Sequence, residues 1–158
     1  MIVLRPRMSL ALSRSGFSLA ELCAVLAVIG ALSSLSLPAL MSYYQGAHVR
    51  GAAADIAAYL NQARQLAIRR NQSTCVHITA AAVHYHLGNC GSGPLWLGPG
   101  TDANGNIPAP DGITLASSAD PVFTNLGAAA PAATITVTHG RASLSVIVSA
   151  SGRVTVGR

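Results

Sequence analysis

The sequence predicts an α+β fold in which one long N-terminal helix packs on an antiparallel β-sheet domain. An apolar stretch of about 24 residues comes first, and apolar residues at helical spacing continue after it. From Ser73 onward, short runs of β-branched and aromatic residues alternate with turn residues, which is typical of strands. We therefore expect a transmembrane helix segment over 17–40, its amphipathic continuation over 41–71, and a β-rich globular domain over 72–158.

The apolar stretch is long enough to cross a membrane. As a helix it would measure about 36 Å, whereas the hydrocarbon layer of a bilayer is about 30 Å thick. All basic residues of the 158-residue chain are arginines, and Arg5, Arg7 and Arg14 precede the stretch while none lies within it. This asymmetry predicts a single-pass protein with a cytoplasmic N-terminus and a C-terminal domain outside the cytoplasm.

Three other interpretations of this stretch explain less. A cleaved secretory signal has an apolar region of only about 7–15 residues. A buried core helix would make the charge asymmetry accidental. A plain uncleaved signal anchor would leave the pattern of Gly16, Phe17 and Glu21 unexplained.

Glu21 is the only acid between Ser15 and Val49, and this range also contains no arginine. A lone carboxylate within a bilayer costs about 2.5–3.5 kcal/mol on insertion scales, so it should have a partner or a function. The partner must be another molecule or a new chain end, such as the amine that cleavage after Gly16 would create on Phe17. The alternative is a tolerated interfacial acid near the end of the helix.

The segment SGFSLAEL, residues 15–22, resembles the processing site of type IV prepilins and type II secretion pseudopilins. In that family the leader ends in glycine, phenylalanine usually follows, and glutamate occupies the fifth mature position. The resemblance implies a prepilin leader peptide over 1–16 and cleavage between Gly16 and Phe17 by prepilin peptidase. It also implies N-methylation of Phe17 and an assembly role for Glu21, which would pair with the amine of a neighbouring subunit.

The helix is expected to continue beyond the membrane. Pro38 falls where the family commonly has a helix-kinking proline, and it cannot donate a backbone hydrogen bond. The apolar residues that follow recur at spacings of three and four: Val49, Ala53, Ile56, Leu60, Ala63 and Ala67. This single face predicts packing against the globular domain, with the helix ending near Asn71.

The β-rich part contains two strong strand signals. The stretch STCVHITAAAVHYHL predicts two strands, and residues 133–158 form three alternating runs separated by turns at His139–Gly140 and Ser151–Gly152. Residues 88–112 predict a long irregular connection, and GITLASS and PVFTNL predict weaker strands. The whole resembles the minor-subunit branch that includes GspH and FimT.

Two cysteines and three histidines lie close together in the exported part. Cys75 and Cys90 are in a compartment where oxidation is favoured, so we expect a disulfide between them. The alternative is a metal site that adds His77, His84 and His86. Because the spacing matches no standard zinc pattern and oxidation removes the thiolates, we interpret the histidines as exposed strand residues and expect no metal.

No convincing catalytic constellation is present, so the sequence predicts neither an enzyme nor a cofactor. The resemblance implies a minor pseudopilin or pilin subunit of H type, from a type II secretion or type IV pilus system, assembled into an envelope filament. Its implied location is the bacterial inner membrane, with a periplasmic C-terminal domain. Its implied partners are prepilin peptidase, the major and minor pseudopilins or pilins, the inner-membrane assembly platform and membrane lipid.

DNA binding for natural transformation is the alternative function. No acid follows Asp120, whereas Arg141, Arg153 and Arg158 do. DNA-binding FimT-type proteins have a Gly-Arg-x-Arg tail, but here the stretch is GRVTVGR and its second arginine is displaced to Arg158. Loss of the leader would leave seven of the ten arginines against five acids. Solvated arginines on a β edge are therefore the competing interpretation.

Overall fold

The computed structural model describes residues 16–157, so the leader before Gly16 and Arg158 lie outside the described residues. The chain divides into two compact units, of which one ends at Pro38 and the other begins at Ala39. A single helix, α1 (Leu19–Arg70), contributes to both units. The strands all belong to the second unit, which we call the globular unit.

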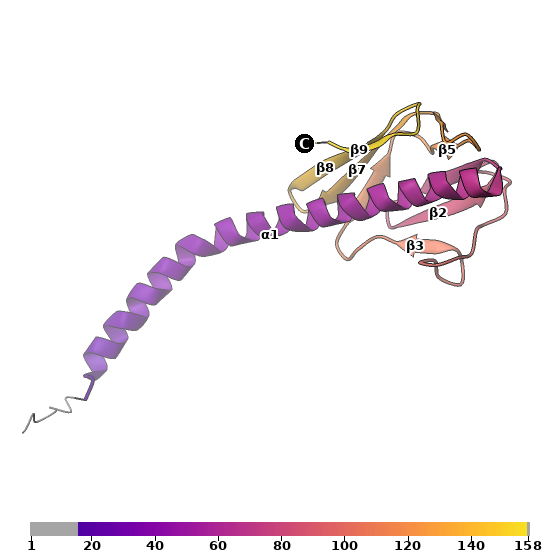
Figure 1. Ribbon diagram of the computed structural model, residues 1–158. Coiled ribbons are helices and arrows are strands. Elements are labelled where there is room, and N and C mark those ends of the chain that lie inside the picture. Colours follow the sequence, from indigo (N-terminus) through magenta and orange to yellow (C-terminus); the bar gives the residue numbers. More distant parts are fainter. Residues whose placement is uncertain (1–15, 158) are drawn as a thin grey trace, which may run out of the picture. The chain divides into compact units, whose positions relative to one another are not determined.

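Two antiparallel sheets form the globular unit (Figure 1). The first has the order β3-β2-β1-β5-β6 and contains β1 (Thr74–Ile78), β2 (Ala82–Leu87), β3 (Asn106–Pro108), β5 (Val122–Phe123) and β6 (Ala129–Ala130). The second has the order β4-β7-β8-β9 and contains β4 (Thr114–Ser117), β7 (Ala133–His139), β8 (Ala142–Val148) and β9 (Val154–Val156).

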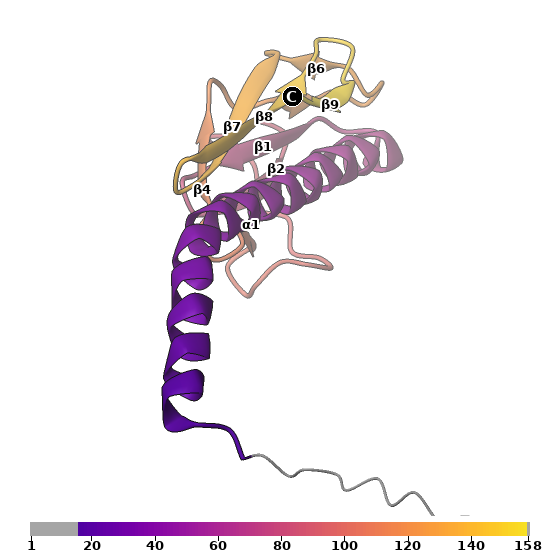
Figure 2. The same cartoon turned by 90° about the vertical axis from the view of Figure 1, so that its left-hand side faces the viewer.

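The core lies between α1 and the two sheets. The whole apolar face expected from the sequence is buried, with exposed fractions of 2% or less: Val49, Ala53, Ile56, Leu60, Ala63 and Ala67. It belongs to one cluster with Val83 and Tyr85 of the first sheet and with Val146 of the second. Figure 2 shows this half of α1 alongside β1 and β2. Burial of a valine, isoleucine or leucine side chain stabilises by about 1.5–3 kcal/mol, so the larger residues of this stripe hold the helix to the sheets.

Polar contacts fix the position of α1 within the globular unit. The buried Tyr85 hydroxyl donates to the carbonyl of Tyr59 at 2.8 Å, and Arg64 Nε donates to the carbonyl of Gly127 at 2.9 Å. The helix ends at Arg70, and Asn71 adopts a left-handed conformation with φ of 50°, a common way to terminate a helix. This agrees with the predicted end near Asn71.

The strands predicted from the sequence are present, and the antiparallel β-sheet domain expected from it consists of two sheets. The chain leaves β4 of the second sheet and enters β5 of the first through a short connection that ends in Pro121, whose missing N–H cannot extend a ladder. The two-residue β6 and the three-residue β3 were not predicted. β3 lies within the stretch expected to be irregular and forms because it pairs with β2.

Candidate functional site

The first described residues surround the predicted cleavage junction. Ser18 precedes the helix, and its carbonyl accepts the N–H groups of Glu21 and Leu22 at 3.0 and 3.1 Å. Phe17 is 79% exposed, and a Cβ added to Gly16 would meet nothing within 4 Å. The residues on either side of the junction are therefore open to another molecule.

Glu21 lies in the first turn of α1 and is exposed. The only ion pair among residues 16–157 joins two other residues, so Glu21 has no basic partner in this part of the chain. A carboxylate at a helix N-terminus gains about 0.3–1 kcal/mol from the helix dipole. This gain is smaller than the cost of about 2.5–3.5 kcal/mol for an acid within a bilayer, so the dipole alone does not account for Glu21.

The first half of α1, by which we mean residues 19–40, exposes apolar side chains over its whole length. Each of the following is at least 46% exposed: Leu19, Leu22, Val25, Leu26, Val28, Ile29, Leu32, Leu37 and Leu40. Within the described residues α1 is the one helix long and apolar enough to cross a membrane, by length and composition. Pro38 lies inside this helix, and the kink expected there stays a prediction.

Two serine hydroxyls in this half of α1 are satisfied by the helix itself. Ser34 Oγ donates to the carbonyl of Ala31 at 2.8 Å, and Ser36 Oγ donates to the carbonyl of Leu32 at 3.1 Å. Such internal pairing suits lipid, where an unsatisfied polar group costs several kcal/mol.

The predicted disulfide is present in the globular unit. Cys75 of β1 is bonded to Cys90, 15 residues further along, with Cα atoms 5.1 Å apart. Cys75 is fully buried, and Cys23 in the first half of α1 is a free, exposed cysteine. Neither thiol of the bonded pair is therefore available as a metal ligand.

Three histidines share one face of the first sheet with Cys75. His77 of β1 lies directly opposite His84 of β2, and Cys75 lies opposite His86. Alternate residues of a strand share a face, so these four positions all lie opposite the face that carries the buried Tyr85. As they are oriented, no three His, Cys, Asp or Glu side chains among residues 16–157 stand where they could hold a metal ion.

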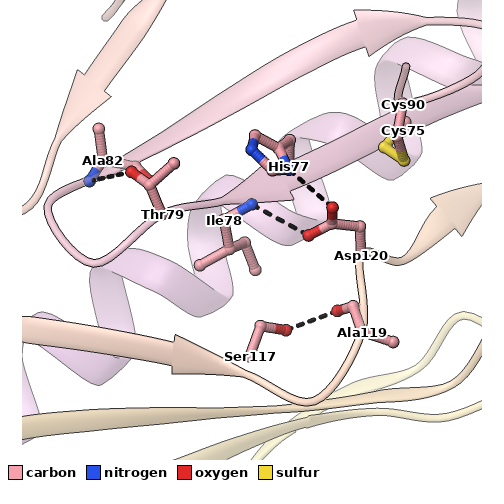
Figure 3. Close-up of polar contacts among 9 residues, drawn as sticks. All are labelled: Cys75, His77, Ile78, Thr79, Ala82, Cys90, Ser117, Ala119 and Asp120. Carbon is pink, nitrogen blue, oxygen red and sulfur yellow. Dashed lines mark hydrogen bonds and ion pairs between the residues drawn. A yellow bond between two sulfur atoms is a disulfide. The ribbon is translucent and has the colours of Figure 1, made fainter.

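Asp120 holds His77 from a distant part of the sequence (Figure 3). Its Oδ2 lies 2.6 Å from His77 Nδ1, and its Oδ1 accepts the N–H of Ile78 at 3.2 Å. His86 Nδ1 lies 3.0 Å from the carbonyl oxygen of Gly93. Two of the three imidazoles are thus oriented through their Nδ1 atoms. No sequence pattern indicates the contact with Asp120, because 43 residues separate it from His77.

Protonation of His84, the middle histidine in the sequence, is disfavoured. Partial burial lowers the pKa of His84, the nearby His77 and His86 lower it further, and Asp102 acts in the opposite direction. The pKa of Asp102 is itself lowered, first by the backbone N–H of Asn106, which donates to this carboxylate at 2.8 Å. His84 therefore has a stronger tendency than a free histidine to remain neutral.

The structure does not bring the predicted DNA-binding arginines together. Arg141 precedes β8 (Ala142–Val148) and Arg153 follows it after a turn, so the two residues lie at opposite ends of this strand. At about 3.3 Å per residue their backbones are about 25 Å apart. Arg158 lies outside the described residues.

The architecture defines the class: a pilin-like α+β fold, with a long N-terminal helix whose second half packs on antiparallel sheets. Solved structures that share this fold include the type IV minor pilin FimU of Pseudomonas aeruginosa, at 15% identity and a TM-score of 0.55 over 70% of this chain and 88% of that one. They also include the minor pseudopilin EpsH of the type 2 secretion system of Vibrio cholerae, at 13% identity and a TM-score of 0.56 over 69% and 95%. At these identities the likeness concerns the fold alone.

Residues 52–152 match the family described as Type II transport protein GspH. Because this match covers more than half of the sequence, the chain belongs to the GspH family. No curated protein sequence matches the chain. The family match begins after the first half of α1. The resemblance of residues 15–22 to a prepilin processing site is therefore independent of the family match.

Proposed function

We propose that the protein is a minor subunit of a type II secretion pseudopilus or a type IV pilus, cut between Gly16 and Phe17 by prepilin peptidase and methylated on Phe17. The first half of α1 anchors it in the bacterial inner membrane, with the globular unit in the periplasm. Membership of the GspH family supports the subunit role. The exposed apolar surface of α1 and the arginines that precede it in the sequence support the anchor.

The proposed assembly step rests on the position of Glu21. It is a single acid on an otherwise apolar, exposed part of α1, and it has no basic partner among the described residues. In a filament the α1 helices of neighbouring subunits cover this apolar surface, and the Phe17 amine of one neighbour neutralises Glu21. The platform and the other pilins or pseudopilins are the partners this step requires.

Processing is tested by co-expressing the full chain with a prepilin peptidase and measuring the intact mass and N-terminal sequence of the product. We expect a chain that begins at Phe17 and carries one additional methyl group. Gly16→Val should abolish cleavage, and Gly30→Val is the matched control because an added Cβ meets nothing within 4 Å at either position. A product that retains its leader, or one cut elsewhere, would refute this part of the proposal.

Assembly is tested with Glu21→Gln, which removes the charge and keeps the shape. In cells that express the other subunits, we expect cross-linking of this variant to neighbouring subunits to fall at least about tenfold, as a buried unpaired amine costs several kcal/mol. Asp55→Asn is the matched control, because Asp55 is an exposed acid on the half of α1 that belongs to the globular unit. Equal cross-linking of Glu21→Gln and the unmodified chain would contradict the pairing.

DNA binding is the second candidate, and exposed Arg141 and Arg153 support it. Because they lie at opposite ends of β8, a duplex would have to lie along the strand to contact both. Titration with duplex DNA at two salt concentrations should give a slope of about −2 for two phosphate contacts. The double variant Arg141→Gln/Arg153→Gln should lose this binding, whereas the control Arg70→Gln should keep it. Absence of DNA binding by the unmodified chain at low salt would refute this second function.

A further inference from the structure

The three histidines on the outer face of the β1–β2 hairpin form a set of ligands that does not include the cysteines. The thiols of Cys75 and Cys90 are consumed by their mutual bond, so imidazoles are the only soft or borderline donors left on this face. His84 and His86 alternate on β2, and His77 lies opposite His84 on β1. Three imidazoles with a fourth position left to water form one of the ligand sets that zinc uses in proteins.

The hydrogen bonds of two of these rings leave the same nitrogen free. A carbonyl oxygen only accepts, so the Nδ1 of His86 carries the proton that it donates to Gly93. When Asp120 is ionised, its carboxylate likewise accepts a hydrogen bond from the Nδ1–H group of His77. In each neutral ring the lone pair is then on Nε2, the atom that can bind a metal. Donation of the other ring N–H to a carboxylate or a carbonyl is the usual support of a metal-ligating histidine.

The rings of His84 and His86 both lie near the ring of His77. The ring centroid of His77 lies 5.9 Å from that of His84 and 6.3 Å from that of His86. Imidazoles bound to one tetrahedral zinc, with Zn–N bonds of about 2.0–2.1 Å, have centroids about 5 Å apart. The rings do not yet converge on one point. All three side chains are only partly buried, so the rings have room to rotate toward one another, as metal binding would require.

We propose that His77, His84 and His86 bind a borderline divalent cation, Zn²⁺ first among them, through their Nε2 atoms on the outer face of the first sheet. Asp120 is a positioning residue that orients His77 and offsets part of the added charge. Imidazole ligands favour zinc, copper and nickel over magnesium and calcium, which prefer oxygen. This role is separate from anchoring and assembly, which use the first half of α1.

The test is calorimetric titration with Zn²⁺ of the full, disulfide-bonded chain, prepared without a histidine tag in a non-denaturing detergent and freed of metals by chelation. We expect saturable binding of about one Zn²⁺ per chain that excess Mg²⁺ or Ca²⁺ does not displace. Absence of saturable binding at about 0.1 mM Zn²⁺, or equal binding of Ca²⁺, would overturn the proposal.

Variants distinguish this site from other histidines. We expect His84→Gln and His77→Gln each to weaken Zn²⁺ binding by more than about tenfold, whereas His48→Gln and His139→Gln, outside the hairpin, leave it unchanged. Trp96 fluorescence reports whether each variant is folded. Unchanged affinity in both His84→Gln and His77→Gln would overturn the assignment.

Asp120→Asn separates a positioning role from a merely structural one. It keeps all three ligands but replaces a charged acceptor, so Zn²⁺ affinity should fall by about tenfold while the urea midpoint of the metal-free chain changes little. The ¹⁵N resonances of the His77 and His86 rings provide a second measurement. On Zn²⁺ addition their Nε2 signals should shift while Nδ1 remains protonated, and shifts at Nδ1 alone would contradict the proposed geometry.

Discussion

The two halves of α1 are both apolar, but among residues 16–157 only the second half has its apolar residues buried. In the second half the apolar residues form a single stripe, and Leu60 within it is 1% exposed. In the first half they occur all around the helix, and Leu32 is 62% exposed. A single apolar stripe on a helix can be buried against one surface. A helix that is apolar all around must be covered from every side. The arrangement of apolar residues therefore indicates whether a helix is covered by its own domain or by lipid and neighbouring subunits.

Leu60→Ala tests this difference most strongly. Deletion of a fully buried leucine side chain leaves a cavity, so the free energy of unfolding of the globular unit should fall by about 3 kcal/mol. It can be measured by urea denaturation of the full chain in a non-denaturing detergent, followed by the fluorescence of Trp96, the only tryptophan. Leu32→Ala should change this value by less than about 0.5 kcal/mol. A comparable loss in Leu32→Ala would mean that the globular unit depends on the first half of α1.

The cysteines allow the same comparison. Replacement of both Cys75 and Cys90 by alanine opens a loop of 15 residues, which should destabilise the globular unit by about 3 kcal/mol because the unfolded chain gains entropy. Cys23→Ala, in the exposed half of α1, should leave the urea midpoint unchanged. If the double variant were as stable as the unmodified chain, strain in the folded state would have to cancel the benefit of the crosslink.

Tyr85→Phe measures how much one polar contact contributes to holding α1 in place. It removes the hydroxyl that donates to the Tyr59 carbonyl, so the free energy of unfolding should fall by about 1 kcal/mol. Tyr43→Phe is the matched control, because Tyr43 is 69% exposed. Equal effects of the two replacements would show that this hydrogen bond does not stabilise the packed half of the helix.

Thr74→Val should have the smallest effect, and in the opposite direction. Thr74 is fully buried, and its Oγ1 has no hydrogen-bond partner among the described residues. Valine has the same shape without an unsatisfied hydroxyl, so the globular unit should gain up to about 1 kcal/mol. Ser36→Ala, in the first half of α1, should leave the free energy of unfolding unchanged in the same urea experiment. A destabilised Thr74→Val would indicate that the hydroxyl is satisfied in solution.

The sequence predicted best those features that depend on residue spacing within a single segment. The face of α1 from Val49 to Ala67 and the hairpin of β1 and β2 follow from spacings within single segments, and both are confirmed. The division into two sheets depends on pairings between distant segments. The contact of Asp120 with His77 also depends on such pairings, and no spacing in the sequence predicts it.

The separation of the arginines follows from the turns alone. Turns are predicted at His139–Gly140 and Ser151–Gly152, and residues that follow successive turns of a meander lie at opposite ends of the strand between them. Arg141 and Arg153 each follow one of these turns, so their spacing could be predicted from the sequence. The histidines show the reverse case: the spacing of His77, His84 and His86 in the sequence matches no standard zinc pattern, and only the strand register shows that they share one face.

The continuity of α1 has a mechanical consequence. A force applied to the first half of α1 reaches the globular unit through the buried stripe from Val49 to Ala67, which runs along the second half of the same helix. All the contacts of this stripe then bear the load together, in shear, instead of separating one after another. The Tyr59–Tyr85 and Arg64–Gly127 hydrogen bonds lie along the same length and resist sliding of the helix. The globular unit is therefore expected to stay folded while it is pulled or pushed through α1.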